Sequence, residues 1–322
     1  MKLSKLLLIA LLMCASLPAM AQMNDTYVIP VTANARGAFG THWMTRFSLF
    51  NPQLDYPLTI SVTFLPTGGA QGAEELVEIP ANSLATSDNI LDDLFDVTSG
   101  SGSLLVAAFH EDQVAGVPNT VIARSFLVNS DTFNNHPNGT YGQGIPGVWA
   151  GLLDFDYDKI SSVAHNIRNE GVWRTNIGAL NLGRCSVSVR VNVYDFDGNR
   201  VLTQAPLNVP PLGHIQDRLP IAIDNATVEF FVEDPCTNDD DRFAVVFPYT
   251  STIDQRTGDP SYQQPTLLAL AGNLYAKGGQ QIDPLNVGKK LDSSIARNVR
   301  SQVERRGKAS LVRTESGWKI EK

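Results

Sequence analysis

Two stretches of this sequence match each other: Gly40-Thr41-His42-Trp43-Met44-Thr45-Arg46-Phe47 and Gly171-Val172-Trp173-Arg174-Thr175-Asn176-Ile177. With a gap of one residue, Trp43 aligns with Trp173, Thr45 with Thr175 and, farther on, Asn51 with Asn181, all at the same offset. A self-match at a fixed spacing indicates a repeated structural unit. The sequence therefore predicts two copies of one module.

The segments that follow each copy alternate between apolar and polar residues. Apolar residues stand at Leu58, Ile60, Val62 and Phe64 in the first copy and at Val187, Val189, Val191 and Val193 in the second. This period of two is typical of a strand with one buried face. Turns end both strands, at residues 66–69 and 195–199.

Further short apolar segments and turn signals continue through both copies. We expect strands at 103–109, 121–128, 227–232 and 243–249, a turn at Gly100-Ser101-Gly102-Ser103, and about one turn of helix from Asn89 to Phe95. Such a pattern favours an all-β fold of two tandem immunoglobulin-like β-sandwich domains. The predicted boundaries are 22–148 and 161–272 for the domains and 149–160 for the linker between them.

The order of these residues resembles tandem β-sandwich modules of unknown function in exported bacterial proteins. The resemblance covers about residues 27–268 and rests on the IP, WxT, NP, FLP and GTYGQ motifs, followed by a second copy with WRTN, LNLG and DGN. It implies an extracytoplasmic sandwich and no catalytic residue. Cys185, Cys236 and the C-terminal tail are not part of the resemblance.

The N-terminus carries the features of a secretory signal. Lys2 and Lys5 precede an apolar run from Leu6 to Leu17, and Ala19-Met20-Ala21 forms a small-x-small cleavage pattern. The run is shorter than the 20 or so residues of a spanning helix. We expect residues 1–21 to be removed and the protein to act in the periplasm or outside the cell, with no transmembrane span. A retained N-terminal anchor is the alternative.

Charge is divided unevenly along the chain. The predicted tail, residues 273–322, has a net charge of +6, and residues 22–272 have a net charge of −16. An acidic body repels nucleic acid, so we expect no nucleic-acid partner. The tail itself predicts a helix from Ser293 to Arg306, ended by Gly307, and a hairpin around 315–317. We expect it to fold back on the acidic modules or to dock on an acidic partner; a disordered tail is the alternative.

Two cysteines, Cys185 and Cys236, remain after signal removal. An even number in an oxidising compartment favours a disulfide between them, although two free buried thiols are the alternative.

Motifs for catalysis are missing from the sequence. It contains no GxSxG, Walker or GxGxxG motif, and the five histidines are scattered at positions 42, 110, 136, 165 and 214. We therefore expect no enzyme activity and no cofactor.

Two patterns allow a ligand site. Acidic clusters at 154–158, 195–199 and 234–241 supply oxygens of the kind that calcium binds, and the last is the best candidate, although a solvated loop is the simpler interpretation. Trp149, Tyr157, Tyr141 and Tyr262 lie in stretches that resemble loops and could stack on a sugar. The sequence thus predicts a non-catalytic binding or structural protein with a protein or glycan ligand; the alternatives are a carbohydrate-binding protein and, last, a hydrolase.

Overall fold

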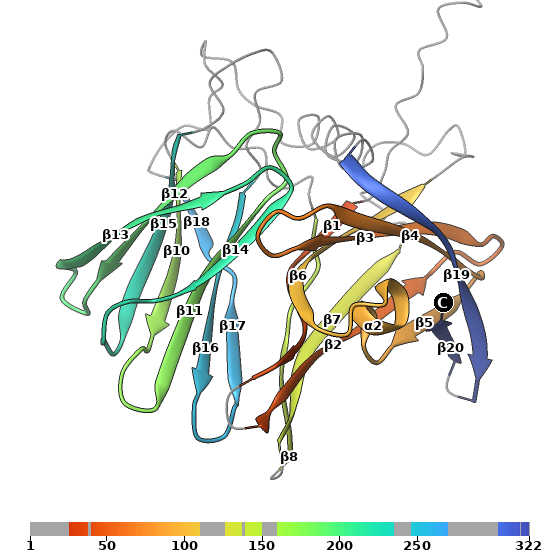
Figure 1. Cartoon of the computed structure of the whole chain (residues 1–322), viewed down its shortest axis with the longest axis horizontal. Helices are drawn as coiled ribbons and strands as arrows, with labels where there is room; N and C mark the ends of the chain where they lie inside the picture. Colours follow the sequence, from red (N-terminus) through yellow and green to blue (C-terminus); the bar gives the residue numbers. More distant parts are fainter. Residues whose placement is uncertain are drawn as a thin grey trace, which may run out of the picture.

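The computed structural model describes residues 26–37, 40–109, 126–136, 139–149, 160–234, 246–269, 302–315 and 317–321. Most of them lie in strands (Figure 1). The predicted signal, residues 1–21, lies outside the described residues. Within the described part, no helix has the length and apolar character needed to cross a membrane.

The described residues of the first half of the chain form nine strands and one short helix. These are β1 (Thr26–Arg36), β2 (His42–Asn51), β3 (Leu58–Pro66), β4 (Gly72–Ile79), β5 (Ser83–Ser87), α2 (Ile90–Phe95), β6 (Gly100–Phe109), β7 (Leu127–His136), β8 (Gly139–Gly144) and β9 (Val148–Trp149). The predicted alternation is confirmed in β3, where Leu58, Ile60, Val62 and Phe64 are all buried in the first core.

The predicted turn of helix is confirmed as α2. Its residues Ile90, Leu91, Leu94 and Phe95 are buried in the first core, which explains why so short a helix forms. Asp96 ends α2 in the left-handed conformation, with φ 57° and ψ 27°, and its N–H returns to the last turn.

One local prediction is wrong. Residues Gly100 to Ser103, expected as a turn, are the first residues of β6 and pair with β1 and β3. A Cβ atom at Gly102 would lie 2.2 Å from the Leu65 carbonyl oxygen. The glycine permits this close approach of two strands, which sequence alone does not distinguish from a turn.

In the second half, the part that the structure describes contains nine strands. These are β10 (Ile160–Ile167), β11 (Trp173–Asn181), β12 (Val187–Tyr194), β13 (Arg200–Val209), β14 (Gly213–Arg218), β15 (Ala226–Asp234), β16 (Val246–Asp254), β17 (Pro260–Gln263) and β18 (Thr266–Ala269). The alternating valines of β12 are all buried in a second core.

The two halves share one strand order. In the first half, neighbouring strands run β4-β3-β6-β1-β9 and, on the other side, β5-β2-β7-β8; in the second half they run β13-β12-β15-β10-β18 and β14-β11-β16-β17. Each strand of the second half thus takes the place of the strand nine numbers earlier. The repeat in the sequence is matched by a repeat in topology.

The end of the chain adds a hairpin to the first half, β19 (Val303–Thr314) and β20 (Gly317–Glu321). β19 pairs in parallel with β4, and β20 pairs in parallel with β5 (Figure 1, dark blue). The predicted hairpin is confirmed. The predicted helix from Ser293 to Arg306 is wrong at its end, because Val303 to Arg306 belong to β19; its residues before 302 lie outside the described part.

This hairpin changes the architecture expected for the first half. Because β19 and β20 bridge β4 and β5, and β1 also pairs with β2, eight strands close into one barrel-like sheet instead of an open sandwich. The all-β class is confirmed, but the sandwich expected for the first half is wrong in this respect. The apolar side chains of the hairpin, Ala309 and Ile320, join the first core, and this burial explains the closure.

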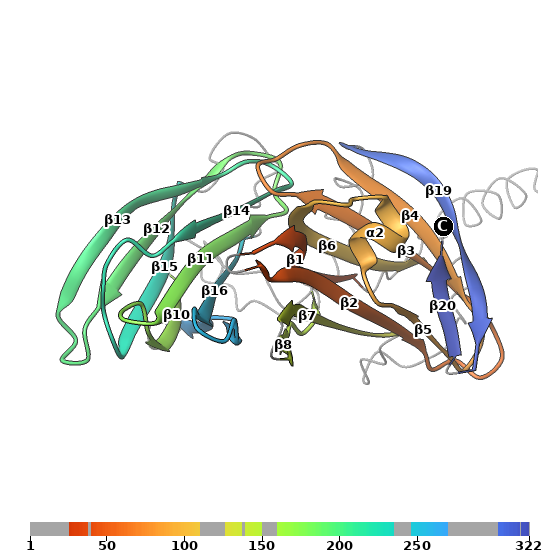
Figure 2. The same ribbon diagram turned by 60° about the horizontal axis from the view of Figure 1, so that its bottom comes forward.

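The two halves pack directly against each other (Figure 2). Val28, Leu65 and Leu105 point outward from the sheet of β1, β3 and β6, and they form one buried apolar cluster with residues of the second half, chiefly Leu180 and Phe247. Full burial of such a side chain stabilises by about 1.5–3 kcal/mol. The halves therefore share a sizeable apolar interface.

Candidate functional site

Exposed apolar side chains gather at one corner of the first half. Among the described residues, seven large apolar side chains are strongly exposed, and four of them lie at this corner: Leu54 (76%), Leu127 (53%), Tyr56 (42%) and Leu84 (42%). A concentration of exposed apolar surface at one place indicates an interaction site.

Strand register places three apolar residues in a row at this corner. Phe50 of β2 lies opposite Leu84 of β5 and opposite Leu127 of β7. Directly opposed residues of antiparallel strands have Cβ atoms about 5 Å apart. Phe47 and Leu49 of β2 are buried in the core, so the half-buried Phe50 points to the outer face.

The loop between β2 and β3 brings two more apolar residues to the row. The Asn82 N–H donates to the Gln53 carbonyl (2.7 Å), and Asn51 Nδ2 donates to the Tyr56 carbonyl (3.1 Å). These bonds hold Leu54 and Tyr56 beside the strand ends. We call Phe50, Leu54, Tyr56, Leu84 and Leu127 the apolar corner.

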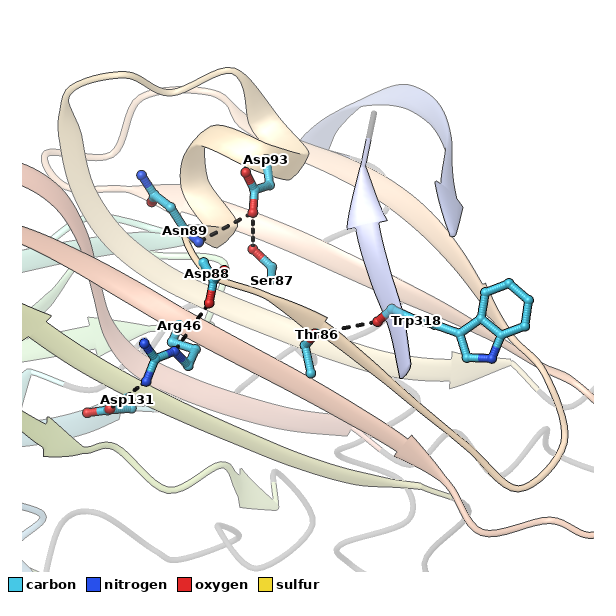
Figure 3. Close-up of polar contacts among 8 residues, drawn as sticks. All are labelled: Arg46, Thr86, Ser87, Asp88, Asn89, Asp93, Asp131 and Trp318. Atoms are coloured by element: carbon cyan, nitrogen blue, oxygen red, sulfur yellow. Dashed lines mark hydrogen bonds and ion pairs between the residues drawn. The ribbon is translucent and has the colours of Figure 1, made fainter. Parts of the chain in front are cut away.

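A charged row crosses the same outer face four residues away along β2. Arg46 Nε lies 3.4 Å from Asp88 Oδ1, and Arg46 Nη1 lies 3.9 Å from Asp131 Oδ2 (Figure 3). The guanidinium also lies 4.8 Å from the centre of the Phe133 ring. Exposed ion pairs of this kind contribute only about 0–1 kcal/mol to stability. The charged row therefore places positive and negative groups beside the apolar corner, and its ion pairs add little to the stability of the fold.

Asp88 is positioned by its neighbours on both sides. Asp93 Oδ2 accepts from the Ser87 hydroxyl (2.7 Å) and from the Asn89 N–H (3.3 Å), so a carboxylate of α2 closes the turn that carries Asp88 (Figure 3). The Thr86 hydroxyl donates to the Trp318 carbonyl of β20 (3.5 Å). The C-terminal hairpin thus supports the edge of this face.

A polar cluster lies on the outer face of the second half, on β12 and β15. Glu229 Oε2 accepts from Asn192 Nδ2 and from the Tyr194 hydroxyl, both at 2.9 Å. Burial raises the pKa of Glu229, but hydrogen bonds from Asn192, Ser161 and Tyr194 outweigh it and hold the pKa below its usual value. The ordered carboxylate, amide and phenol are groups that bind sugar hydroxyls.

A second network lies at the interface between the halves, and its central His214 and Tyr249 side chains are fully buried. His214 Nδ1 lies 2.8 Å from the Thr67 hydroxyl and His214 Nε2 lies 2.7 Å from the Tyr249 hydroxyl, which donates to Gln216 Oε1 (2.9 Å). Because Tyr249 donates to Gln216, its oxygen accepts from His214 Nε2, and Thr67 donates to Nδ1. Burial lowers the pKa of His214 to about 4, so the ring is neutral near pH 7. This network joins the halves.

A glycine makes room for the Tyr249 ring. Gly178 of β11 lies opposite both Tyr249 and Gln216, and a Cβ atom there would lie 2.3–2.5 Å from three atoms of the Tyr249 side chain. The ring therefore lies across the strand where a side chain is missing. No motif in the sequence indicated this arrangement; the only sign was a lone glycine within an otherwise regular strand.

The predicted sugar-binding aromatics that the structure describes come from three different strands. Tyr262 of β17 is largely buried and stacks on Tyr249, with ring centres 5.9 Å apart, and burial raises its pKa. Tyr141 lies in β8 and Trp149 in β9, so these three residues lie in strands, where loops were expected. Tyr157 lies outside the described residues.

The predicted acidic clusters have different outcomes. Asp195 caps its own turn, because its carboxylate accepts the N–H groups of Asp197 and Asn199 (3.1 and 2.8 Å); the bond from Asn199 is the main cause of a lowered pKa. Residues 154–158 lie outside the described part, as do 235–241. Within the described part, no three His, Cys, Asp or Glu side chains gather as a metal site would require.

The predicted disulfide stays a prediction, because Cys236 lies outside the described residues. Cys185 packs against the second core. Three residues after Cys185, Ser188 pairs with Asp234, which stands two residues before Cys236. Antiparallel pairing at this point places Cys185 near the end of the β12–β15 pair at which β15 ends.

Comparisons with known proteins assign no family. No family model and no curated protein matches the chain. A secreted protein of Parabacteroides distasonis, 7% identical, aligns over 73% of this chain and 88% of its own with a TM-score of 0.19. A β-glucuronidase of Bacteroides uniformis, 9% identical, aligns over 76% and 31% with a TM-score of 0.17. A Clostridium perfringens M60 catalytic domain with two carbohydrate-binding modules, 8% identical, aligns over 76% and 34% with a TM-score of 0.15. Likenesses this slight carry no argument about function.

Proposed function

We propose that the mature chain is an exported, non-catalytic protein that binds another protein through the apolar corner and the charged row of its first half. The apolar corner is the observation that carries this proposal. The predicted N-terminal signal supports action in the periplasm or outside the cell.

The chemistry of the corner favours a protein over a sugar. Three of its five side chains are leucines, and only Tyr56 presents a strongly exposed aromatic ring. Sugars stack on flat rings and need hydrogen-bonding groups beside them, whereas a protein interface has an apolar centre and a polar rim. Asp88, Arg46 and Asp131 supply such a rim.

A photo-crosslinking experiment tests this proposal. A photoreactive phenylalanine placed at Leu84 or Leu127 in the exporting cell should give one defined protein adduct, identified by mass spectrometry. The control position is Phe196, which is 76% exposed on the second half. Leu127→Asp should abolish the adduct at position 84 while thermal unfolding stays cooperative. Equal adducts at 84 and 196, or none at 84 and 127, contradict the proposal.

Carbohydrate binding is the second candidate, and the Glu229 cluster on the outer face of the second half supports it. Asn192, Tyr194 and Glu229 are ordered by mutual hydrogen bonds, and Tyr194 and Glu229 are partly exposed to solvent. A glycan array with the intact protein tests this function. Binding that Glu229→Gln abolishes, and that Leu127→Asp leaves unchanged, would support it.

A further inference from the structure

The repeat provides an internal example of what the exposed row of the first half can bind. Leu127, Phe50 and Leu84 form this free row across β7, β2 and β5. In the second half the equivalent strands are β16, β11 and β14, and the equivalent row is Phe247, Leu180 and His214. Phe50 and Leu84 are offset from their equivalents by the same distance along the chain as the matched tryptophans. We call the second set the docking row.

The docking row is completely buried, whereas the free row is not. Phe247 and Leu180 belong to the apolar cluster that joins the halves, and His214 bonds to Thr67 of the first half. Their partners Val28, Leu65 and Leu105 are an apolar triplet on the outer face of β1, β3 and β6, which we call the acceptor face. One copy of the row is thus seen bound to the outer face of a β-sheet.

The described residues of a second copy of this chain do not offer a matching acceptor face. The acceptor face of the first half is already covered by the docking row. Register identifies its equivalent in the second half as Val163, Tyr194 and Glu229, because Val28 pairs with Leu105 as Val163 pairs with Glu229. The equivalent face of the second half thus carries a carboxylate and a phenol. An apolar row that packed on it would remove these polar groups from water, which is unfavourable.

We propose that the partner of the apolar corner is another exported chain with an all-β module whose outer sheet face carries an apolar triplet like Val28, Leu65 and Leu105. This inference rests on the proposed function and specifies the partner. The free row would pack on that face as the docking row packs on the acceptor face. The partner's module would then be stacked on the first half as the first half is stacked on the second. The charged row would lie at the rim of the new interface.

The protein itself supplies a defined probe for this proposal. The double variant Tyr194→Leu and Glu229→Leu converts the face of the second half into an apolar triplet with Val163. Its chains should then associate head to tail, with the free row of one chain on the new triplet of the next. Sedimentation velocity should show oligomers that grow with concentration, with association at least tenfold tighter than for the parent protein.

A matched variant separates specific docking from general stickiness. Adding Leu84→Asp and Leu127→Asp to the double variant should return it to the association state of the parent protein. Oligomers that persist in this quadruple variant overturn the proposal, because they do not use the free row. Absence of association in a double variant that unfolds cooperatively overturns it as well. In either case, adducts at positions 84 and 127 in cells would leave the proposed function standing.

Discussion

Asn51 and Asn181, which align in the sequence repeat, make the same hydrogen bonds in the two halves of the molecule. Each Nδ2 donates to three backbone carbonyls, and each Oδ1 accepts the N–H of the residue two positions later. The carbonyls belong to Tyr56, Ile79 and Pro80 in the first half and to Cys185, Val209 and Pro210 in the second; the N–H groups belong to Gln53 and Gly183.

Replacement of either asparagine should destabilise the protein strongly. In Asn181→Ala, buried carbonyls lose their donor and we expect a loss of about 2–4 kcal/mol, at about 1 kcal/mol for each hydrogen bond. Urea unfolding measures the change. The control Asn129→Ala removes an exposed asparagine of β7 and should stay within about 0.5 kcal/mol of the parent protein. Equal effects at 129 and 181 would show that the amide bonds do not stabilise this part of the fold.

His214 should make stability depend on pH below neutrality. Its pKa is about 4 in the folded protein and 6.5 when exposed, so the unfolded chain takes up a proton that the folded chain does not. The contribution of the neutral ring is complete above pH 6.5 and is lost as the pH falls to about 4, roughly 3 kcal/mol in total. Urea unfolding at pH 7.5 and 4.5 measures this loss.

The control for that measurement is His214→Gln, which has no titrating ring. The difference between the two pH values should be about 2–3 kcal/mol smaller in this variant than in the parent protein. Other acidic and basic groups contribute equally to both proteins, so the subtraction isolates His214. A variant that loses as much stability as the parent would contradict the assignment.

The two copies of the module could be predicted from the sequence, but the different burial of equivalent positions in the two copies could not. Alternation in β3 and β12 and the matched Trp43 and Trp173 identify two copies, because local strand patterns survive within one chain. Leu84 and His214 are equivalent positions with opposite burial: Leu84 is 42% exposed and His214 is fully buried. From residue type alone, the leucine is expected to be buried and the histidine exposed. The packing of one half on the other determines which position is buried, and no local sequence pattern encodes that contact.

For the C-terminal tail too, the local structure could be predicted from the sequence but the contact with a distant part of the chain could not. The pattern around residues 315–317 indicated a hairpin, but its place between β4 and β5 depends on partners near the opposite end of the chain. The edges explain why the hairpin joins the first half. β4 pairs with β3 in unbroken register, whereas β13 is bulged twice against β12 and contains Pro206. Bulges and prolines protect an edge strand, and a regular edge needs a cover.

Deletion of residues 302–322 should therefore expose the β4 edge. We expect a loss of at least about 2 kcal/mol, the value of one buried isoleucine, from Ile320 alone, and aggregation that light scattering detects. Val312→Asp is the matched control, because Val312 is 43% exposed on the same hairpin and should have little effect. A truncated chain that remains monomeric and equally stable would show that the hairpin is not needed as a cover.

The predicted pair Cys185 and Cys236 should be found linked in exported protein. Peptide mapping without reduction should recover one peptide pair that joins the two residues. Closing a loop of about 50 residues stabilises by roughly 4 kcal/mol in the chain-entropy model, so mild reduction should lower the urea midpoint by a matching amount. Two freely alkylated thiols in native protein would contradict the pairing.

Gly178→Ala should disrupt the joint between the halves through Tyr249. The added methyl group would lie 2.3–2.5 Å from the Tyr249 ring and hydroxyl, closer than real contacts allow, so the ring must move away from His214 and Gln216. Overpacking of this kind costs about 1–3 kcal/mol, and the broken hydrogen bonds add to it. Urea unfolding should therefore show a large loss of stability.

The matched control for this substitution is Gly144→Ala in β8, where a Cβ atom meets nothing within 4 Å and little change is expected. Because the displaced Tyr249 no longer orders His214, Gly178→Ala should also lose part of the pH dependence expected between pH 7.5 and 4.5. A Gly178→Ala protein with unchanged stability and unchanged pH dependence would show that the ring has room to relax and that the joint does not depend on it.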